Sequence, residues 1–338
     1  MPTNHIPTRP RGRVSWAFLL TFSCCLSGLV GTAEAQTVAQ ATKLRVEKVA
    51  DGSGWNVFQG DELVAGYLKD SNGKPIIYPL HGPAGHPMTR DFPMKDAGEH
   101  ERDDHDHHRS LWLTHGDVNG FDFWLDDDHC GKIIQTSGEA SVEGDSVVIA
   151  TTNDWVDPEG NKLLSDSRRF AFRDLDGRRV IDCDFLLNAE YGDVNFGDTK
   201  EGSFGARLAG TMKVDAKMGG LITNADGKNN KDAWGKKSAW VNYSGPVHGD
   251  TVGMTIHDHP SSFGYPCRWH VRTYGLFAAN PFGVHHFTGG EKTKGIVLSK
   301  DGTMRLNYRV VLYAGEFDAE VAEKDSKQFA NDPRPAIK

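Results

Sequence analysis

Reactive side chains are densest in the stretch HDHHRSLWLTHGDVNGFDFW, residues 105–124. Its four histidines are His105, His107, His108 and His115. Imidazole titrates near neutral pH, binds metal ions and hydrogen-bonds to sugars or carboxylates, so this density predicts a ligand site. In an extended chain His105 and His107 would share one side and His108 would face the other, so all four converge only if the chain turns. The alternative interpretation is that they bond only to neighbouring loops.

A second polar segment, DTKEGSFGARLAG at residues 198–210, combines Asp198, Lys200 and Glu201 with Arg207 further along the chain. Paired acids beside a cation suit acid–base catalysis, because one carboxyl can stay ionised while the pKa of another rises. A charged turn would have the same composition. The segment therefore indicates either half of a catalytic site or a solvated loop.

Two further segments carry histidines in loop-like surroundings. HDHPSSFGYPCRWHVRTYG, residues 257–275, contains two prolines that stiffen the chain, with His259 before the first and Trp269 after the second. NPFGVHHF, residues 280–287, places His285 beside His286. In a strand these two rings would face opposite sides of the sheet, so at most one of them would enter a given pocket.

We predict four catalytic residues and nine substrate-binding residues from these segments. The catalytic residues are His107, His108, His115 and Glu201, and the substrate-binding residues are Arg109, Trp112, Asn119, Asp198, Lys200, Arg207, His259, Trp269 and His285. Loops and strand ends of a β-sandwich gather distant segments, so we expect the polar residues of 107–115 to share a pocket with Glu201 and Arg207. Asp104 and Asp106 should raise the pKa of the nearby histidines by favouring the imidazolium.

The elements that would position these residues are mostly strands. Apolar and polar residues alternate in twos at 43–49, 76–80, 145–152, 168–174, 178–187, 238–243, 251–258 and 303–315. Asp-Gly within 173–180 and Gly-Asp within 142–147 predict tight hairpins and therefore antiparallel neighbours. Only residues 316–332 have a helical pattern, and we expect that helix to pack on a sheet edge. The pattern predicts an all-β fold, a large antiparallel β-sandwich with a short C-terminal helix.

The first 35 residues have the order of a secretory signal peptide. Three arginines precede an apolar run, and Ala33-Glu34-Ala35 precedes Gln36. We therefore expect a signal peptide at 1–35, a single β-sandwich domain at 36–338, and a secreted or periplasmic location. No second apolar stretch of about 20 residues follows, so no membrane-spanning region is expected after cleavage.

Charge and cysteine content restrict the partners. Loss of residues 1–35 removes three arginines and one glutamate, which changes the formal charge from -8 to -10. An acidic chain argues against a nucleic-acid partner. Cys130, Cys183 and Cys267 remain after cleavage, an odd number without short spacings, which predicts neither a disulfide framework nor a cysteine zinc site. Three buried thiols, or one disulfide and one free thiol, are both compatible with this count.

Four motifs in order carry a resemblance to a family. They are YPLHGPAGHPMTRDFPM, HHRSLWLTHGDVNGFDFW, DTKEGSFGARLAG and DHPSSFGYPCRWHVRTYGLFAANPFG. The sequence resembles the secreted bacterial proteins known as PmoA-like, and the resemblance covers most of the mature chain. Their inherited label, a methane oxygenase subunit, belongs to a multi-span membrane protein. Because this sequence has no second span, we exclude methane oxidation.

The resemblance implies a galactose-mutarotase-like supersandwich, in which a concave sheet face binds sugar and histidine and glutamate transfer protons. By residue type, His107, His108 or His115 would be the histidine, Glu201 the acid, and Arg109 or Arg207 the cation. Tryptophans in or beside the polar segments could stack on sugar rings; they are Trp112, Trp124, Trp234 and Trp269. A carbohydrate-active enzyme using His/Glu acid–base chemistry on a sugar or glycan is therefore the first hypothesis.

Two alternatives remain open from the sequence. A metal-dependent hydrolase or lyase would bind a divalent metal through His107, His108, Glu201 and one of His257, His259 or His285, although the spacing matches no standard metal motif. A non-catalytic glycan-binding module would use only the tryptophans. Metal analysis and turnover assays distinguish the three.

Overall fold

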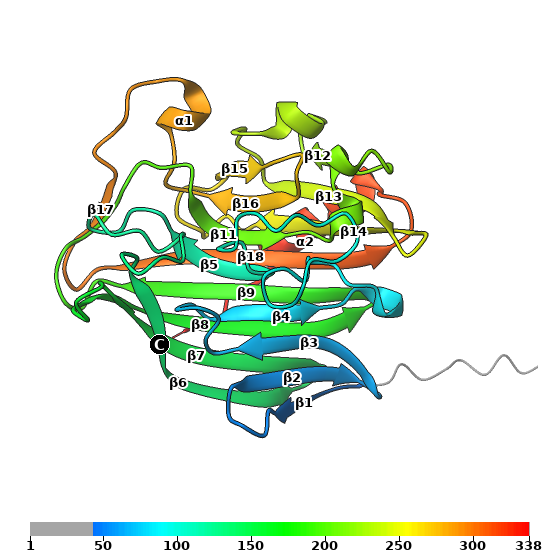
Figure 1. Ribbon diagram of the computed structural model, residues 1–338, viewed down its shortest axis with the longest axis horizontal. Helices are drawn as coiled ribbons and strands as arrows, with labels where there is room; N and C mark the ends of the chain where they lie inside the picture. The colour runs from blue at the N-terminus through cyan, green and yellow to red at the C-terminus, as the bar shows by residue number, and fades with distance from the viewer. Residues whose placement is uncertain (1–42, 338) are drawn as a thin grey trace, which may run out of the picture. The chain divides into compact units, whose positions relative to one another are not determined.

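Two large antiparallel sheets contain most of the strands in the computed structural model (Figure 1), which describes residues 43–337. The predicted signal peptide lies outside the described residues. The first sheet has eight strands in the order β1 (Leu44–Lys48), β2 (Gly54–Gln59), β3 (Glu62–Leu68), β4 (Ile76–Leu80), β5 (Leu111–His115), β11 (Gly202–Arg207), β16 (Leu276–Asn280) and β15 (Arg268–Val271).

The second sheet also has eight strands. Their order is β12 (Leu221–Asn224), β13 (Trp240–Val247), β14 (Asp250–Asp258), β18 (Thr303–Ala314), β9 (Arg178–Asn188), β8 (Lys162–Leu175), β7 (Ser146–Val156) and β6 (Lys132–Glu143). A two-stranded sheet joins β10 (Val194–Phe196) to β17 (Ile296–Leu298). The prediction of a large antiparallel β-sandwich is confirmed.

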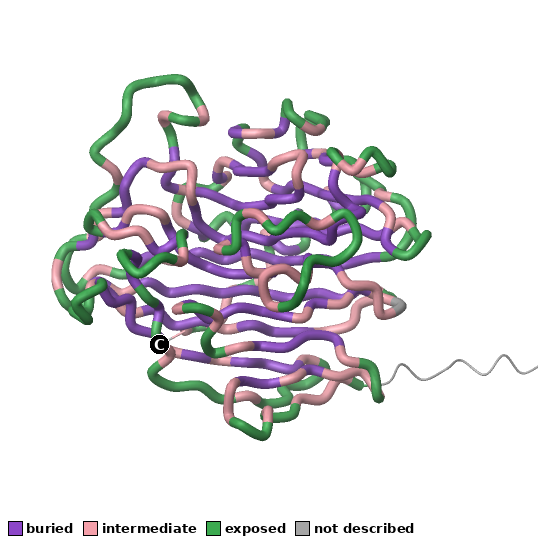
Figure 2. Tube along the Cα trace, in the orientation of Figure 1, coloured by how far each residue is buried: buried purple, intermediate pink, exposed green. Residues whose placement is uncertain are grey.

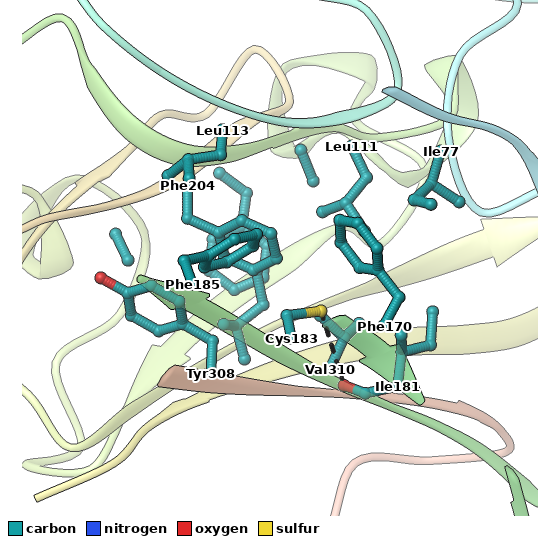
Figure 3. Packing of buried hydrophobic residues seen from close by; sticks show 14 of the residues in the cluster. Ile77, Leu111, Leu113, Phe170, Ile181, Cys183, Phe185, Phe204, Tyr308 and Val310 are labelled. Carbon is teal, nitrogen blue, oxygen red and sulfur yellow. Dashed lines mark hydrogen bonds between the residues drawn. The ribbon is translucent and has the colours of Figure 1, made fainter. Parts of the chain in front are cut away.

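The hydrophobic core lies between the two large sheets. Figure 3 shows Leu113 and Phe204 of the first sheet facing Phe185 and Tyr308 of the second. The rings of Phe204 and Tyr308 stack with centroids 5.0 Å apart. Buried residues follow the strands of both sheets, whereas most loops are exposed (Figure 2). Burial of the inward side chains stabilises the sandwich, and the strand period leaves every second residue on an outer face.

Tight turns connect the long strands of the second sheet, as the sequence predicts. Asp176 and Gly177 join β8 to β9 with φ of 53° and 74°, the conformation that a two-residue hairpin requires. Gly144, with φ of 60°, begins the equivalent turn between β6 and β7. Both hairpin predictions are confirmed.

Short helices complete the chain. The 3-10 helices are η1 (Pro83–Gly85), η2 (Gly210–Met212), η3 (Val214–Ala216) and η4 (Asn230–Ala233), and α1 spans His285–Thr288. The C-terminal helix α2 (Ala319–Asn331) begins after Asp318, whose carboxylate accepts the N–H groups of Glu320 and Val321. It packs against β14, an inner strand of the second sheet, so the expectation of a sheet edge is wrong.

Other expectations concern cysteines and membrane helices. Cys130, Cys183 and Cys267 are buried free thiols, which selects one of the two alternatives left by the sequence. Within residues 43–337, no helix is both long and apolar enough to cross a membrane.

Candidate functional site

The outer face of the first sheet gathers polar side chains from three segments of the chain. On β11, Phe204 and Ala206 point into the core, so Gly205 and Arg207 occupy the outer face. On β15, Trp269 is in the core, and His270 is therefore on the outer face. Strand pairing aligns Gly205 with Trp112 of β5 on one side and with Ala278 of β16 on the other. Gly205 and Ala278 are small residues, and they leave room for the larger side chains above them.

His108 and Arg207 form the buried part of this face. Arg207 Nη1 donates to His108 Nδ1 at 2.9 Å. Arginine only donates, so Nδ1 accepts and the proton of the neutral ring is on Nε2. The His108 ring stacks on Trp112 with centroids 5.5 Å apart, and both residues are almost completely buried. His108 therefore holds Arg207 in place, and Trp112 supports the imidazole from below.

Arg207 also connects this unit to a loop before β5. Its Nη2 donates to Asp104 at 3.1 Å, and its guanidinium lies 4.8 Å from the ring centroid of Tyr274. Arg90 lies 3.5 Å from the same carboxylate. Burial would raise the pKa of Asp104, but the hydrogen bond from His105 and the charges of both arginines lower it. Asp104 is thus an ionised counterion for two buried guanidinium groups.

Glu201 and Lys200 form the more accessible part of the face, and His270 lies buried beside them. Glu201 forms an ion pair with Lys200, and its Oε2 lies 4.0 Å from His270 Nδ1. Burial raises the pKa of Glu201, but Lys200 and the imidazoles of His270 and His107 together lower it below its usual value. The side chain of Glu201 is 29% exposed, so an ionised carboxylate reaches solvent here.

His270 is fixed in one tautomer. Its Nδ1 lies 2.8 Å from the carbonyl oxygen of Lys200, which can only accept, so Nδ1 carries the proton and Nε2 is the basic nitrogen. Burial lowers its pKa to about 4, although Glu201 acts in the opposite direction. The ring is neutral at physiological pH.

His107 lies close enough for its charge to lower the pKa of Glu201. Its own pKa falls to about 4, mainly through burial and then through the nearby Lys74 ammonium. The expectation that Asp104 and Asp106 raise the histidine pKa is therefore wrong for His107 and also for the more deeply buried His108. Asp104 is neutralised by arginines, and burial outweighs the remaining charges.

His115 belongs to the opposite side of the sheet. Leu111 and Leu113 point into the core, and His115 continues that series. Its ring contacts Phe196 and Phe282, and Nε2 lies 2.8 Å from the carbonyl oxygen of Gly197. The structure does not bring His115 together with His107 and His108.

Arg109 and Asn119 are engaged in loops. Arg109 Nε donates to Asp126 at 2.6 Å, beside an ion pair between Asp126 and Lys74. Asn119 donates to the carbonyl of Asp193 and accepts from a backbone N–H of β10. Both residues join segments of the chain rather than extending the group around Glu201.

Asp198 and His285 form an anchor for the loop that contains α1. The Asp198 carboxylate accepts the backbone N–H groups of Val284, His285 and Thr293 at 2.6, 3.1 and 2.9 Å. His285 Nδ1 lies 3.2 Å from the same carboxylate. Phe287 of α1 then packs at 5.2 Å, edge to face, against Trp234. Asp198 therefore positions the wall of the outer face.

His259 and Trp269 lie elsewhere. His259 Nε2 lies 3.2 Å from the carbonyl oxygen of Asp332, and its ring contacts Phe329 of α2. Trp269 is in the core and donates to the carbonyl of Ser238. Neither lies on the outer face of the first sheet.

The sequence patterns did not select His270, Arg272 and Tyr274 for the site, and they indicated Trp234 only as a residue that could stack on a sugar ring. The signal was the alternation in RWHVRTYG: once Trp269 is assigned to the core, His270 must face outward. Trp234 and Tyr274 are partly exposed, and the Arg272 guanidinium lies 5.7 and 5.6 Å from their ring centroids. These residues extend the outer face beyond Arg207.

Metal binding receives no support from the geometry. Across residues 43–337, no three His, Cys, Asp or Glu side chains are arranged to hold a metal ion. His257, an alternative ligand in the sequence analysis, is completely buried in the second sheet.

Solved structures of two carbohydrate-active proteins show a distant likeness to this chain. The galactosidase domain of the alpha-galactosidase-sucrose kinase AgaSK is 8% identical with a TM-score of 0.39, over 80% of this chain and 42% of that one. A Glycoside Hydrolase Family 97 enzyme from Pseudoalteromonas sp. strain K8, in complex with acarbose, is 11% identical with a TM-score of 0.32, over 81% and 34%. The chain thus spans less than half the length of these proteins.

Sequence comparison gives a clearer assignment. No curated protein matches the chain. A family model matches residues 55–327, a range that includes β5, β11, β15 and β16 in full. The chain belongs to the family of unknown function DUF6807.

Proposed function

We propose that this protein is exported and acts on a sugar or glycan at the outer face of the first sheet, with Glu201 as the general base. The observation that carries the proposal is the approach of His270 to Glu201, whose Oε2 lies 4.0 Å from the imidazole Nδ1 although the two residues come from distant segments. His107 packs against His108 of the same face, with ring centroids 4.4 Å apart. Glu201, His270 and His107 are all in their basic forms at neutral pH, because the pKa of Glu201 is lowered and that of each of the two imidazoles is about 4. Such a group can accept a proton from a bound hydroxyl or activated C–H.

Aromatic and cationic neighbours support a sugar as the ligand. Trp234 and Tyr274 are partly exposed, and aromatic faces suit the C–H side of a pyranose. Lys200 and Arg272 supply hydrogen-bond donors for hydroxyl groups. In this proposal Arg207 and His108 are positioning residues, since they are buried and bonded to each other.

We also infer that the PmoA-like proteins and the matched family overlap. All four motifs that carry the PmoA-like resemblance lie inside residues 55–327. The inference gives no activity by itself, since the family is one of unknown function.

The test is turnover of a panel of sugars and oligosaccharides by the wild type and by Glu201→Gln. We expect the variant to lose about 10²- to 10⁴-fold in turnover, the usual contribution of a general base. Glu143→Gln is the matched control, because Glu143 also pairs with a basic side chain, Arg169, but on the second sheet. The control should retain full turnover, and thermal unfolding should show that both variants fold.

Other outcomes decide against the proposal. Loss of wild-type activity on chelation would favour the metal-dependent alternative. Binding of glycans without turnover by the wild type would favour a binding module, and retained turnover by Glu201→Gln would remove Glu201 from the mechanism.

A further inference from the structure

A small pocket borders the outer face where η4 meets the hairpin between β15 and β16. It has a volume of about 220 Å³ and is lined by Lys231, Trp234, Val271, Arg272 and Thr273. This is smaller than the roughly 300–1,000 Å³ of a pocket for a whole drug-sized ligand. The space therefore suits one substituent of a larger molecule.

Arg272 gives the pocket an available cation. Among the described residues, no carboxylate lies within ion-pair distance of its guanidinium, whereas Arg207 and Arg109 are both paired. Its backbone N–H donates to the carbonyl of Leu276, which fixes the residue at the hairpin. The planar guanidinium lies over the rings of Trp234 and Tyr274, so its donors are held in a defined direction.

The surrounding charge favours an anion. Lys231 is a second cation in the lining, and the lining contains no acid. Two acids lie beside the lining: Asp232, which follows Lys231 in the chain, and Asp215, whose backbone N–H donates to the carbonyl oxygen of Thr273. Both are exposed, so solvent screens their charges. The pocket is locally cationic in a chain with a formal charge of -8.

Aromatic contacts connect the pocket to the candidate site. Trp234 meets the His270 ring edge-on with centroids 6.4 Å apart, and His270 lies beside Glu201. On the other side, Tyr274 lies between Arg272 and Arg207. A group bound at Arg272 would thus belong to a sugar ring next to the one at Glu201.

We propose that this pocket binds the carboxylate or sulfate of an acidic sugar residue, so that the substrate is an anionic glycan. The inference rests on the proposed function, because it assigns the substrate class of the same outer face. Both oxoanions can accept two parallel hydrogen bonds from the Arg272 guanidinium, with Lys231 adding a point charge.

The test is calorimetric titration of the mature chain with matched oligosaccharides. Galactose, glucose and mannose backbones are each used in neutral, uronate and sulfated forms, and sodium sulfate is a separate probe. Arg272→Gln removes the proposed fork and Lys231→Gln the second cation. Arg45→Gln is the matched control, since Arg45 also lies over an aromatic ring, 4.2 Å from the centroid of Phe58, at the other end of the sheet.

We expect at least one uronate or sulfated form to bind the wild type about 10-fold or more tightly than its neutral backbone. Arg272→Gln should weaken binding of the acidic form far more than binding of its neutral backbone, and so lose that difference. Lys231→Gln should lose part of the difference, and Arg45→Gln should behave as the wild type. The preferred form identifies whether the carboxylate or the sulfate is the natural group.

The remaining outcomes overturn the inference. The inference is wrong if acidic and neutral forms bind equally, or if Arg272→Gln binds the acidic form as tightly as the wild type does. It is also wrong if sodium sulfate is the only probe that binds. If neutral sugars are turned over and this turnover depends on Glu201, the proposed function stands and only the assignment of the acidic pocket is wrong. If no glycan binds at all, the proposed function fails with it.

Discussion

Replacing Asp198 by asparagine tests how the loop that carries α1 is held against the candidate site. The carboxylate accepts three backbone N–H groups and faces the His285 imidazole. An asparagine keeps the shape and one acceptor oxygen but presents an NH₂ group to the remaining donors. The bonds from the backbone N–H groups of Val284 and His285 can be partly retained, whereas the bond from Thr293 and the contact of the carboxylate with the His285 imidazole are lost.

The expected cost follows from these contacts. A hydrogen bond to a charged group contributes about 1.5–3 kcal/mol net, and Thr293 is exposed, so water recovers part of the lost bond. We expect opening of residues 284–293 to become easier by about 2–4 kcal/mol, which corresponds to roughly 30- to 1,000-fold faster amide exchange in this loop. Because Phe287 packs on Trp234, loosening the loop should also weaken ligand binding at the outer face.

Hydrogen exchange measured by mass spectrometry reports this directly. Asp157→Asn is the control, since Asp157 also accepts a backbone N–H, that of Asn161 at 2.8 Å, in a different turn. Exchange at 284–293 should be faster in Asp198→Asn and unchanged in Asp157→Asn. If Asp198→Asn exchanges this loop within about threefold of the wild type, a difference below 1 kcal/mol, the carboxylate is not the anchor.

The pH dependence of the same loop has a defined sign. Burial would raise the pKa of Asp198, but the N–H donors of Thr293, Val284 and His285 hold it well below its ordinary value. A lowered pKa stabilises the folded state at every pH above the unfolded value of about 3.9, and this stabilisation is lost as the pH falls toward the folded pKa. Wild-type protection should therefore persist from pH 8 to about pH 4 and decrease only below it.

Two further predictions concern stability and export. Burial raises the pKa of Asp258 to about 7, so its contribution to stability is complete below pH 4 and is lost between about pH 4 and pH 7. Asp258→Asn should reduce the pH dependence of the unfolding free energy, measured with urea, by about 2–4 kcal/mol. An unchanged pH profile would contradict the shift. The exported protein should lack about 35 residues and begin near Gln36 by mass spectrometry, whereas an intact N-terminus in the cytoplasm would exclude cleavage.

The strands were predictable because their period depends on local sequence. Residues 303–315 alternate visibly, and β18 is Thr303–Ala314. The C-terminal helix was predicted at 316–332 and begins at Ala319 because the Asp318 side chain caps it. His285 and His286 were considered as strand residues but lie in α1, whose N-terminal N–H groups are bound by Asp198, 87 positions away from His285. A contact of that range leaves no local signal.

The candidate site was only partly predictable. Density of reactive groups identified His107 and Glu201, which share the outer face, but it also selected His115 and Trp269, which point to the core. Alternation within each strand distinguishes the outward from the inward side chains, but only once it is known which residues of that strand face the core. The pKa shifts of His107 and His270 could not be predicted from the sequence, because burial is their largest cause and burial depends on the whole fold.

The alternation on β11 restricts how this face can change in evolution. All six residues of β11 are buried, with Phe204 and Ala206 in the core and Arg207 on the other side. Insertion or deletion of one residue in this strand would exchange the two faces, placing a guanidinium among aromatic rings and an aromatic ring beside His108. Ligand preference here can therefore diverge by substitution, whereas changes in length are confined to the flanking loops.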